Sequence, residues 1–441
     1  MKYLLVILWL LIFTKLFVFW VWLWQLKEYH WGRFKAHFET QLLRKLFFSV
    51  HGARYPKLTK KILAILFSGI VFEITFLFLI FGSRYYLLYL LLSLLIVMDI
   101  ASVIVLLFQI PASIYIKSIL KKAKKKRKEF ENLTVIGIAG SYGKTAVKEF
   151  LYEILSAKFN VLKTKKHINA EIGIAQTILK ELNFSHNILI VEIGAYEKGK
   201  IRQVCDIVKP KMGILTGINE QHLSTFGSQE NINKAKNEIL ECSEIKIDYN
   251  NLDLIATNVV TEREFISFKI NGTNFKVNLL GRHNIDNILL AVSCALKLGM
   301  TLEEIARACL RIKPEQGAMK LIRKDSLTIL DASYSANFNG VIADLDYLNT
   351  YQGRKIIVMP CLIELGSASK EVHKKIGDKI DQVCDFAIIT TKDYFKEIKQ
   401  ERKNIVLIED PAKIVSFLKS VDQGTVLLEG RVPNKLKNEI I

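Results

Sequence analysis

The hexapeptide GSYGKT, residues 140–145, has the residue types of a phosphate-binding loop. Its glycines allow backbone N–H groups to converge on phosphate oxygens, the Lys144 ammonium can reach terminal phosphates, and the Thr145 hydroxyl can bind magnesium. The loop follows a run of β-branched residues and precedes a helical pattern over residues 145–157, which is the strand, turn and helix order that such a loop requires. The general spacing GxxxxGK[ST] would need glycine where the chain has Ile138, so the general motif misses by one residue.

A shorter loop, GTxGKT, is typical of the Mur ligases, which are ATP-dependent amide-forming enzymes of peptidoglycan precursor synthesis. GSYGKT is similar to it, with Ser141 in place of the threonine. Three later segments resemble that family in the same order: ILIVEIGAYEKGKI with Glu192, MGILTGINEQHLSTFGSQENINKAKNEIL with His222 and Lys236, and LLGRHNIDNILLAVSCALKLGMTLEEI with His283 and Asn287. On these four motifs, the part of the chain from about residue 132 to 380 is identified as that of a Mur ligase. It is most similar to the branch that adds D-alanyl-D-alanine to a UDP-linked muramoyl tripeptide.

The resemblance implies a reaction and a set of site residues. A substrate carboxylate would attack the γ-phosphate of ATP, and an incoming amine would displace the resulting acyl phosphate. Thr145 and Glu192 would hold one Mg²⁺ and His222 a second, which Lys236 would help to organise as a carbamate; Lys144, His222 and Lys236 are the catalytic candidates. The residues implied in ATP binding are Gly140, Ser141, Tyr142, Gly143, Lys144, Thr145, His283 and Asn287. Taken singly, Glu192 could instead form a strand-end salt bridge, His222 could be a turn residue and Lys236 an exposed helix lysine.

A second and smaller α/β domain is predicted from residue 313 onward, because short strand patterns alternate there with helical ones. It resembles the C-terminal domain of the family, which closes over ATP and brings the amine. Several family positions differ in this chain, namely Ala318, Ala332, Ser335, Phe338, Pro360 and Cys361, and of the family's NxNN element only Asn169 remains. These differences leave open an ATP-binding membrane scaffold or regulator without ligase activity. A ligase for another polymer such as polyglutamate also stays open, because the polyglutamate synthetase likewise combines a membrane segment with a core that resembles the Mur ligases.

Three long apolar runs, residues 3–24, 62–81 and 85–110, precede the loop, and each is long enough to cross about 30 Å of hydrocarbon as a helix. Residues 1–128 carry 20 Lys and Arg against 4 Asp and Glu, which accounts for 16 of the 19 net positive charges. Basic residues beside apolar runs indicate membrane flanks, so no nucleic-acid partner is expected. The positive-inside rule places the N-terminus outside and everything after residue 110 in the cytoplasm, in a multi-pass protein of the cell membrane.

The expected fold class is α/β with three parts. They are an α-helical transmembrane region over residues 1–128, a central parallel-sheet domain with the phosphate loop over residues 129–312, and a Rossmann-like α/β domain over residues 313–441. The membrane region stands where the family has its UDP-muramoyl-binding domain. We therefore hypothesise a lipid-linked muramoyl peptide as the acceptor, or a soluble one held weakly, with D-alanyl-D-alanine or another amine as the second substrate.

Polar residues within and beside the apolar runs carry further expectations. Lys15, Glu73 and Asp99 lie near the middle of their runs and are expected to face one another inside the bundle. Residues 27–47 mix basic and aromatic side chains at helical spacing, which predicts a helix on the inner leaflet or else a solvated loop. The 6 cysteines are scattered beyond the apolar region without a CxxC pair, so reduced and mostly buried thiols are expected rather than a zinc site or disulfides.

Overall fold

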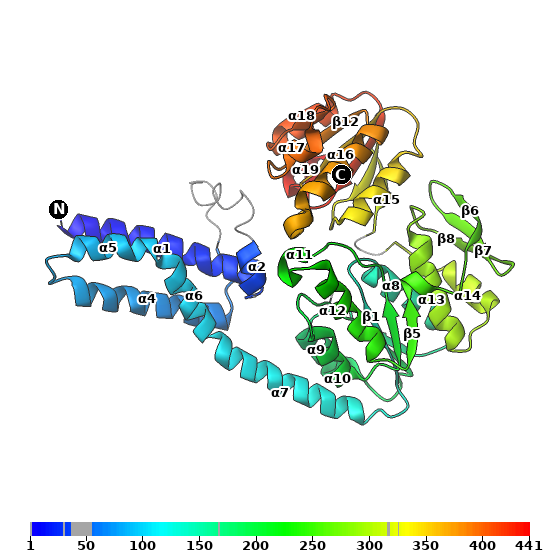
Figure 1. Cartoon of the computed structure of the whole chain (residues 1–441), viewed down its shortest axis with the longest axis horizontal. Helices are drawn as coiled ribbons and strands as arrows, with labels where there is room; N and C mark the ends of the chain where they lie inside the picture. Colours follow the sequence, from blue (N-terminus) through cyan, green and yellow to red (C-terminus); the bar gives the residue numbers. More distant parts are fainter. Residues whose placement is uncertain (1, 30, 37–54, 166–167, 315–317, 325) are drawn as a thin grey trace. The chain divides into compact units, whose positions relative to one another are not determined.

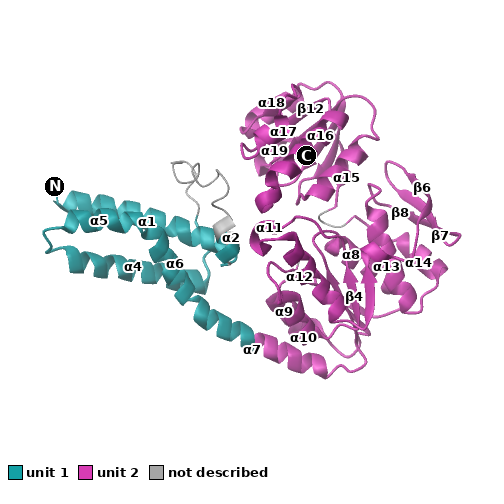
Figure 2. Ribbon diagram, in the orientation of Figure 1, with its two compact units in different colours: residues 1–118 teal, residues 119–441 magenta. Residues whose placement is uncertain are grey.

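The chain forms two compact units, Met1–Ser118 and Ile119–Ile441 (Figure 2). The computed structural model describes residues 2–29, 31–36, 55–165, 168–314, 318–324 and 326–441. Over these residues the first unit is helical and the second contains three β-sheets accompanied by helices (Figure 1). The α/β class expected from the sequence is therefore confirmed.

The first unit consists of helices, most of which are strongly apolar. They are α1 (Lys2–Leu26), α2 (Trp31–Ala36), α4 (Lys60–Ile80), α5 (Tyr86–Leu95), α6 (Val97–Leu107) and the beginning of α7 (Gln109–Lys128). Three segments among the described residues are long and apolar enough to cross a membrane, namely Lys2–Leu26, Lys60–Ile80 and Val97–Lys128. The third expected run is divided, because α5 ends before Ile96 and the following apolar helix continues into the basic residues of α7.

Buried indole groups connect α1 to both α5 and α6. Trp9 Nε1 donates a hydrogen bond to Ser93 Oγ at 2.9 Å, and Trp24 Nε1 donates to Ser102 Oγ at 3.0 Å. Each bond satisfies a buried N–H group that apolar surroundings would otherwise leave without a partner. The first part of α1 therefore lies beside α5, and the last part of α1 lies beside α6.

The expectation that the three charged residues of the apolar runs face one another is wrong. Glu73 is buried and accepts hydrogen bonds from Thr14 Oγ1 at 3.0 and 3.2 Å, whereas Lys15 and Asp99 are exposed. The cause is the rotation of each helix about its axis, which packing against its neighbours determines. Of the basic and aromatic stretch at residues 27–47, Trp31–Ala36 is helical, and its residues from 37 onward lie outside the described part of the chain.

The central part of the second unit is a five-stranded parallel sheet of order β2-β3-β1-β4-β5. Parallel strands need crossover connections, and helices supply them here, so the apolar strands are covered on both faces. The strands are β1 (Thr134–Ala139), β2 (Val161–Lys163), β3 (Ile188–Glu192), β4 (Met212–Leu215) and β5 (Ile245–Asp248), and the helices are α8 (Lys144–Leu155), α9 (Glu171–Glu181), α10 (Lys200–Val208), α11 (Leu223–Phe226) and α12 (Gln229–Glu241).

An antiparallel sheet of order β6-β7-β8 and two helices follow the central sheet. Their bounds are β6 (Thr257–Thr261), β7 (Ile266–Ile270), β8 (Thr273–Val277), α13 (Asn284–Lys297) and α14 (Leu302–Cys309). Phe268 and Phe275 stack within the same apolar core that contains Ile136 of β1 and Leu151 of α8. The small sheet and the parallel sheet thus share one core.

The C-terminal part of the second unit contains a six-stranded sheet of order β13-β12-β11-β14-β10-β9, in which only β9 is antiparallel to its neighbour. The short strand patterns read from the sequence are therefore confirmed. The strands are β9 (Lys320–Lys324), β10 (Leu327–Ala332), β11 (Lys355–Met359), β12 (Phe386–Ile389), β13 (Ile405–Leu407) and β14 (Gly424–Glu429), and the helices are α15 (Phe338–Leu348), α16 (Ser369–Val383), α17 (Phe395–Lys399), α18 (Pro411–Lys419) and α19 (Asn434–Ile440).

The end of α7 is bonded to the central sheet domain through two of its basic residues. Lys126 Nζ donates to the carbonyl oxygens of Leu179 and Leu182 at 3.0 and 2.7 Å, at the end of α9. Arg127 Nε donates to the Val208 carbonyl oxygen at 3.0 Å, at the end of α10. Cations at helix C-termini satisfy carbonyl groups that have no partner within the helix. Part of the basic sequence that was expected to flank the membrane therefore stabilises the protein itself.

Candidate active site

The phosphate loop lies between β1 and α8, and two of its glycines have backbone conformations that other residues rarely adopt. Gly140 has φ of 151° and Gly143 has φ of 80°. A Cβ atom on Gly140 would lie 1.9 Å from Thr216 Oγ1, and one on Gly143 would lie 2.5 Å from Asn287 Oδ1. Both positions therefore need glycine. The first N–H groups of α8 have no partner within the helix, so they are available to an anion at this end.

The loop is anchored on the segment that follows β4. Ser141 N donates to the Gly217 carbonyl oxygen at 2.8 Å, and Thr216 Oγ1 donates to the Tyr142 carbonyl oxygen. The Tyr142 ring covers Gly217, where a Cβ atom would lie 2.0 Å from the ring. Within the described residues, the buried Ser141 Oγ has no hydrogen-bond partner, and a phosphate oxygen would supply one. The loop therefore fits a nucleotide phosphate.

Glu192 ends β3 next to the loop, because its neighbour in register on β1 is Ile138. Thr145 Oγ1 and Lys148 Nζ each donate to Glu192 Oε2 at 3.0 Å, and Asn169 Nδ2 donates to Oε1 at 3.1 Å. The Lys148 and Glu192 side chains are 0% and 2% exposed, so this ion pair is buried. Three donors from three segments thus fix one carboxylate at the carboxyl edge of the sheet.

The residues at this edge fit a magnesium ion that is shared with a phosphate. Mg²⁺ prefers hard oxygen ligands and is usually bound by one or two carboxylates together with phosphate oxygens and water. Glu192 and Thr145 offer such oxygens, and no cluster of three or more His, Cys, Asp or Glu that could form an all-protein metal site is present in the described residues. The donor set therefore suits a nucleotide-bound Mg²⁺.

Lys236 lies on the buried face of α12, and its Nζ donates to the Ala195 carbonyl oxygen at 3.0 Å. Burial, and then the charge of Lys144, lowers the pKa of Lys236 from 10.5 to about 7. A lysine with such a pKa is partly neutral at physiological pH, and only the neutral amine can react with CO₂. The surroundings of Lys236 are thus compatible with carbamate formation.

His222 precedes α11 in a left-handed conformation, with φ of 68°. Its Nδ1 lies 2.7 Å from Glu364 Oε2, and its ring contacts Tyr196 edge-on at 4.7 Å between centroids. A carboxylate accepts hydrogen bonds, so the contact assigns the proton to Nδ1 and leaves the Nε2 lone pair for a ligand. Burial lowers the pKa of His222, the Glu364 contact opposes this shift, and the charges of Lys236 and Lys144 add to it. The three catalytic candidates therefore lie within electrostatic range of one another.

Of His283 and Asn287, which are both implied in ATP binding, the structure brings Asn287 to the phosphate loop, where its Oδ1 approaches Gly143. His283 lies instead against Gly281, and its Nε2 is 3.2 Å from Asn284 Nδ2. Its Nδ1 is buried without a hydrogen-bond partner in the described part of the chain. His283 therefore retains one nitrogen for a ligand but is not held against the loop.

The C-terminal sheet domain contributes its own contacts to this region. Asn219 Nδ2 donates to Asn337 Oδ1 at 3.1 Å and to Asn339 Oδ1 at 2.9 Å. At the end of β10, Asp331 is held by Lys437 Nζ at 3.1 Å and by Ser333 N at 3.1 Å. Asp331, the residue before Ala332, is thus already paired within the C-terminal sheet domain.

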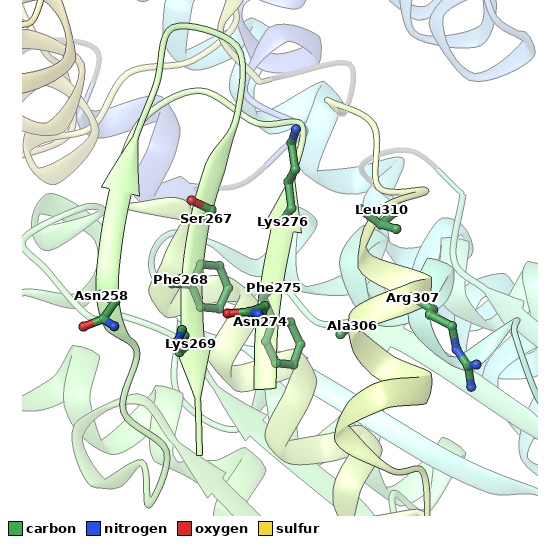
Figure 3. Close-up of a pocket in the computed structure, with 10 residues that line it drawn as sticks. All are labelled: Asn258, Ser267, Phe268, Lys269, Asn274, Phe275, Lys276, Ala306, Arg307 and Leu310. Atoms are coloured by element: carbon green, nitrogen blue, oxygen red, sulfur yellow. The ribbon is translucent and has the colours of Figure 1, made fainter. Parts of the chain in front are cut away.

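A surface groove of about 420 Å³ lies between the β6-β7-β8 sheet and α14, with Lys269, Lys276 and Arg307 among its lining residues (Figure 3). None of the site residues predicted from the sequence lines it. The assignment of the site therefore rests on the contacts around the phosphate loop and not on this groove.

Comparison with known proteins identifies both sheet domains. A model of the Mur ligase middle domain matches residues 138–254, and a model described as Mur ligase, glutamate ligase domain matches residues 319–430. The chain belongs to the Mur ligase family.

Curated relatives of this Mur ligase include the UDP-N-acetylmuramoyl-tripeptide–D-alanyl-D-alanine ligase of Buchnera aphidicola subsp. Baizongia pistaciae. It is 32% identical over 282 residues, which are 56% of this chain and 61% of the relative. The chain spans 59% to 61% of the length of the first curated relatives that it matches.

Two solved structures share the fold of the second unit. The MurF ligase of Thermotoga maritima, solved in complex with ADP, is 25% identical, with a TM-score of 0.66 and coverage of 74% of this chain and 84% of that one. MurF from Acinetobacter baumannii is 24% identical, with a TM-score of 0.68 and coverage of 74% and 80%.

Two residues of this Mur ligase site escaped sequence reasoning. Lys148 left a signal, because it shares the apolar face of α8 with Val147 and Leu151, and a charge on such a face indicates a buried partner. Glu364 left no comparable signal, since it meets His222 from a position 142 residues away.

Proposed function

We infer that this Mur ligase is a membrane-anchored, ATP-dependent enzyme that joins the carboxylate of a muramoyl peptide to an amine such as D-alanyl-D-alanine. The observation that carries the proposal is the buried Glu192 carboxylate, which Thr145, Lys148 and Asn169 hold beside the phosphate loop. Burial of a charged carboxylate costs free energy. Such a group is therefore expected more often at a site that binds a metal and a phosphate than at a strand end with only a structural role.

The proposed reaction has two steps. In the first, a carboxylate oxygen of the acceptor attacks the γ-phosphorus of ATP, and the bond to the bridging oxygen breaks, so that ADP leaves with the electron pair. In the second, the amine attacks the carbonyl carbon of the acyl phosphate, phosphate leaves, and the amine loses a proton. Phosphoryl transfer of this kind depends mainly on positioning and on the neutralisation of charge.

The residues of the chain divide these tasks between them. The N-terminal N–H groups of α8 and the Lys144 ammonium would hold the phosphates, with Asn287 against the loop. Thr145 and Glu192 would hold the magnesium ion, whose charge lowers the repulsion between the phosphates and the incoming carboxylate.

A second site is proposed around His222 and Lys236. As a carbamate, Lys236 would be an anion in a region where Lys144 otherwise disfavours its positive charge. Together with the Nε2 atom of His222 it would bind a second magnesium ion. Glu364 would orient the His222 ring, as carboxylates commonly do for metal-binding histidines.

The membrane helices suggest where the substrate is found. Three segments are long and apolar enough to span, and the basic excess of residues 1–128 favours a cytoplasmic location for the rest of the chain. An enzyme anchored in the bilayer shares a surface with any lipid-linked acceptor, which raises the effective concentration of that acceptor. We therefore propose a polyprenyl-linked muramoyl peptide as the preferred carboxylate substrate.

A second candidate function is nucleotide binding without ligation, in a scaffold or regulator for cell-wall enzymes. The pairing of Asp331 with Lys437 favours it, because the carboxylate nearest to Ala332 is engaged within its own domain. The resemblance to the family implies an acidic residue at position 332 that contacts the ribose of ATP, and with Ala332 there an active ligase would need another group for this contact.

The test uses the full chain reconstituted in vesicles, with ATP, Mg²⁺, D-alanyl-D-alanine and either a polyprenyl-linked or a UDP-linked muramoyl peptide. Phosphate release that requires both the peptide and the amine supports the ligase, whereas nucleotide binding without such release supports the scaffold. The rate with the lipid-linked peptide should exceed the rate with the UDP-linked peptide by about tenfold or more. Equal rates would contradict the proposed preference for a lipid-linked substrate but would not contradict the ligase activity.

A further inference from the structure

The outward faces of α1 and α6 each carry a single charge within an apolar stripe. On α1, Lys15 continues a line of exposed residues that includes Leu8 and Leu11, which are 52% and 67% exposed. On α6, Asp99 begins a line that includes Val103, which is 56% exposed. Since residues three or four apart share a helix face, each charge lies on the side of its helix that its own bundle leaves uncovered.

Neither charge can readily pair within its own chain. Phe13 and Phe17, two positions to either side of Lys15, are buried, and a two-residue step turns a helix by about 200°. Asp99 is flanked in the same way by Val97 and Ala101, both buried. The Lys15 and Asp99 side chains thus point away from the apolar core of the helical bundle. Within the described residues, neither side chain forms an ion pair.

The two charges lie at nearly the same depth in the bundle. Trp9 bonds to Ser93 and Trp24 bonds to Ser102, so α1 runs in the same direction as α5 and α6 and in a defined register. Lys15 falls between the two tryptophans, and Asp99 falls between the two serines. Interpolation between the two bonds puts Lys15 and Asp99 within about one helical turn of each other along the bundle axis.

An isolated charge at this depth is costly in a membrane. Lys15 is about 17 Å or more from either end of α1, which is farther than a lysine side chain can extend to reach the headgroups. Charges in such places almost always face the interior of a helix bundle or a water-filled cavity, and they pair with one another or with backbone carbonyl groups. A neighbouring acid at mid-depth would satisfy Lys15, and a neighbouring base at the same depth would satisfy Asp99.

A second copy of this chain supplies both partners. We propose that the α1 face of one copy packs against the α6 face of another within the membrane, with Lys15 of one copy paired to Asp99 of its neighbour. The proposal depends on the membrane placement proposed above but not on the ligase chemistry.

Charge reversal tests the pairing. Two populations of the full chain, labelled with donor and acceptor fluorophores, are reconstituted together in the same vesicles. Their association is measured by energy transfer. Lys15→Glu and Asp99→Lys should each weaken association by about tenfold or more, since each places like charges together. The double variant Lys15→Glu/Asp99→Lys should restore association, because the pair is re-formed with its signs exchanged. Association that neither single variant changes, or a double variant no better than the singles, would overturn the proposal.

Cross-linking tests which surfaces meet. One tagged copy carries Lys15→Cys and a differently tagged copy carries Asp99→Cys, and the expected product is a disulfide-linked pair of the two tags. Ile70→Cys replaces Asp99→Cys as the control, since Ile70 is 51% exposed but lies on α4, and it should give no such product. The natural cysteines all lie beyond residue 204, so a product that needs both introduced residues is specific.

Extraction with alkaline carbonate separates this proposal from the membrane placement. If the chain resists extraction but does not associate with a second copy, the pair between copies is wrong while the membrane placement stands. Association with a different protein only would have the same meaning. Chain that carbonate releases overturns the membrane placement and the pair together.

Discussion

Replacement of Lys148 by methionine gives the sharpest test of the site geometry. Lys148→Met keeps the length of the side chain but removes the ammonium, so Glu192 stays buried with two neutral donors, Thr145 and Asn169. Removal of one partner of a buried ion pair costs about 3–5 kcal/mol. The two remaining donors favour the lower end, about 3 kcal/mol, which corresponds to a fall in Tm of roughly 4–5 °C for a unit that spans Ile119–Ile441.

The distribution of cysteine and tryptophan makes this loss measurable in the full chain. All 6 cysteines lie in the second unit and five of them are buried, so a thiol-reactive fluorophore reports the unfolding of that unit. All 5 tryptophans lie within the first 31 residues, so indole fluorescence reports the first, helical unit separately. The thiol signal should move to lower temperature in Lys148→Met, and the indole signal should not move.

Two further variants separate charge from packing. Lys148→Met/Glu192→Gln should recover most of the loss, to within about 1 kcal/mol of the parent, because no uncompensated charge remains. Lys158→Met removes an exposed pair with Glu304, whose side chains are 42% and 34% exposed, and should cost less than about 1 kcal/mol. A loss below about 1 kcal/mol in Lys148→Met, or a double variant less stable than it, would refute the reasoning.

Four other outcomes are expected. Lys144→Ala should abolish ATP turnover while carbonate-resistant membrane association persists, and turnover equal to that of the parent would exclude the loop assignment. Lys236→Ala should be inactive and partly rescued by short-chain carboxylic acids that occupy the place of the carbamate; full activity without rescue would remove the carbamate from the mechanism. Glu364→Gln should raise the Mg²⁺ concentration for half-maximal phosphate release by about tenfold, since His222 loses its orienting carboxylate, and an unchanged value would contradict that role. Burial, and then the negative charge of Asp344 on α15, raises the folded-state pKa of Glu429 well above its ordinary value of 4.5, so stability falls as the pH rises above 4.5 and through the folded-state pKa. Glu429→Gln should flatten this fall in thiol-reporter melts, and an unchanged profile would show that Glu429 is not its source.

The sequence predicts those parts of the site that depend on a local motif or on the topology of a parallel sheet. The loop between β1 and α8 has a signature of its own, and Glu192 could be placed beside it because parallel strands bring their carboxyl ends to one edge. The structure places Lys144, Thr145 and Glu192 together as expected, while the roles inferred for them stay predictions.

The remaining features depend on tertiary packing, which a single sequence does not encode in a readable way. The contact of Glu364 with His222 joins two sheet domains that are distant in the chain. The depth of Lys15 and Asp99 could be counted along the apolar runs, but the direction in which each side chain points depends on how its helix is rotated against its neighbours. That rotation turned an expected internal cluster into two outward charges.

The most direct test of the central claim is the fate of oxygen in the acceptor carboxylate. The full chain is supplied with ATP, Mg²⁺, D-alanyl-D-alanine and a muramoyl peptide whose terminal carboxylate carries ¹⁸O at both oxygens, and the released phosphate is analysed by mass spectrometry. An acyl phosphate formed at this site must transfer one ¹⁸O atom from the carboxylate to each phosphate released, together with one new amide bond. Unlabelled phosphate would mean that water attacks ATP, and would contradict the assignment of the chain as a ligase.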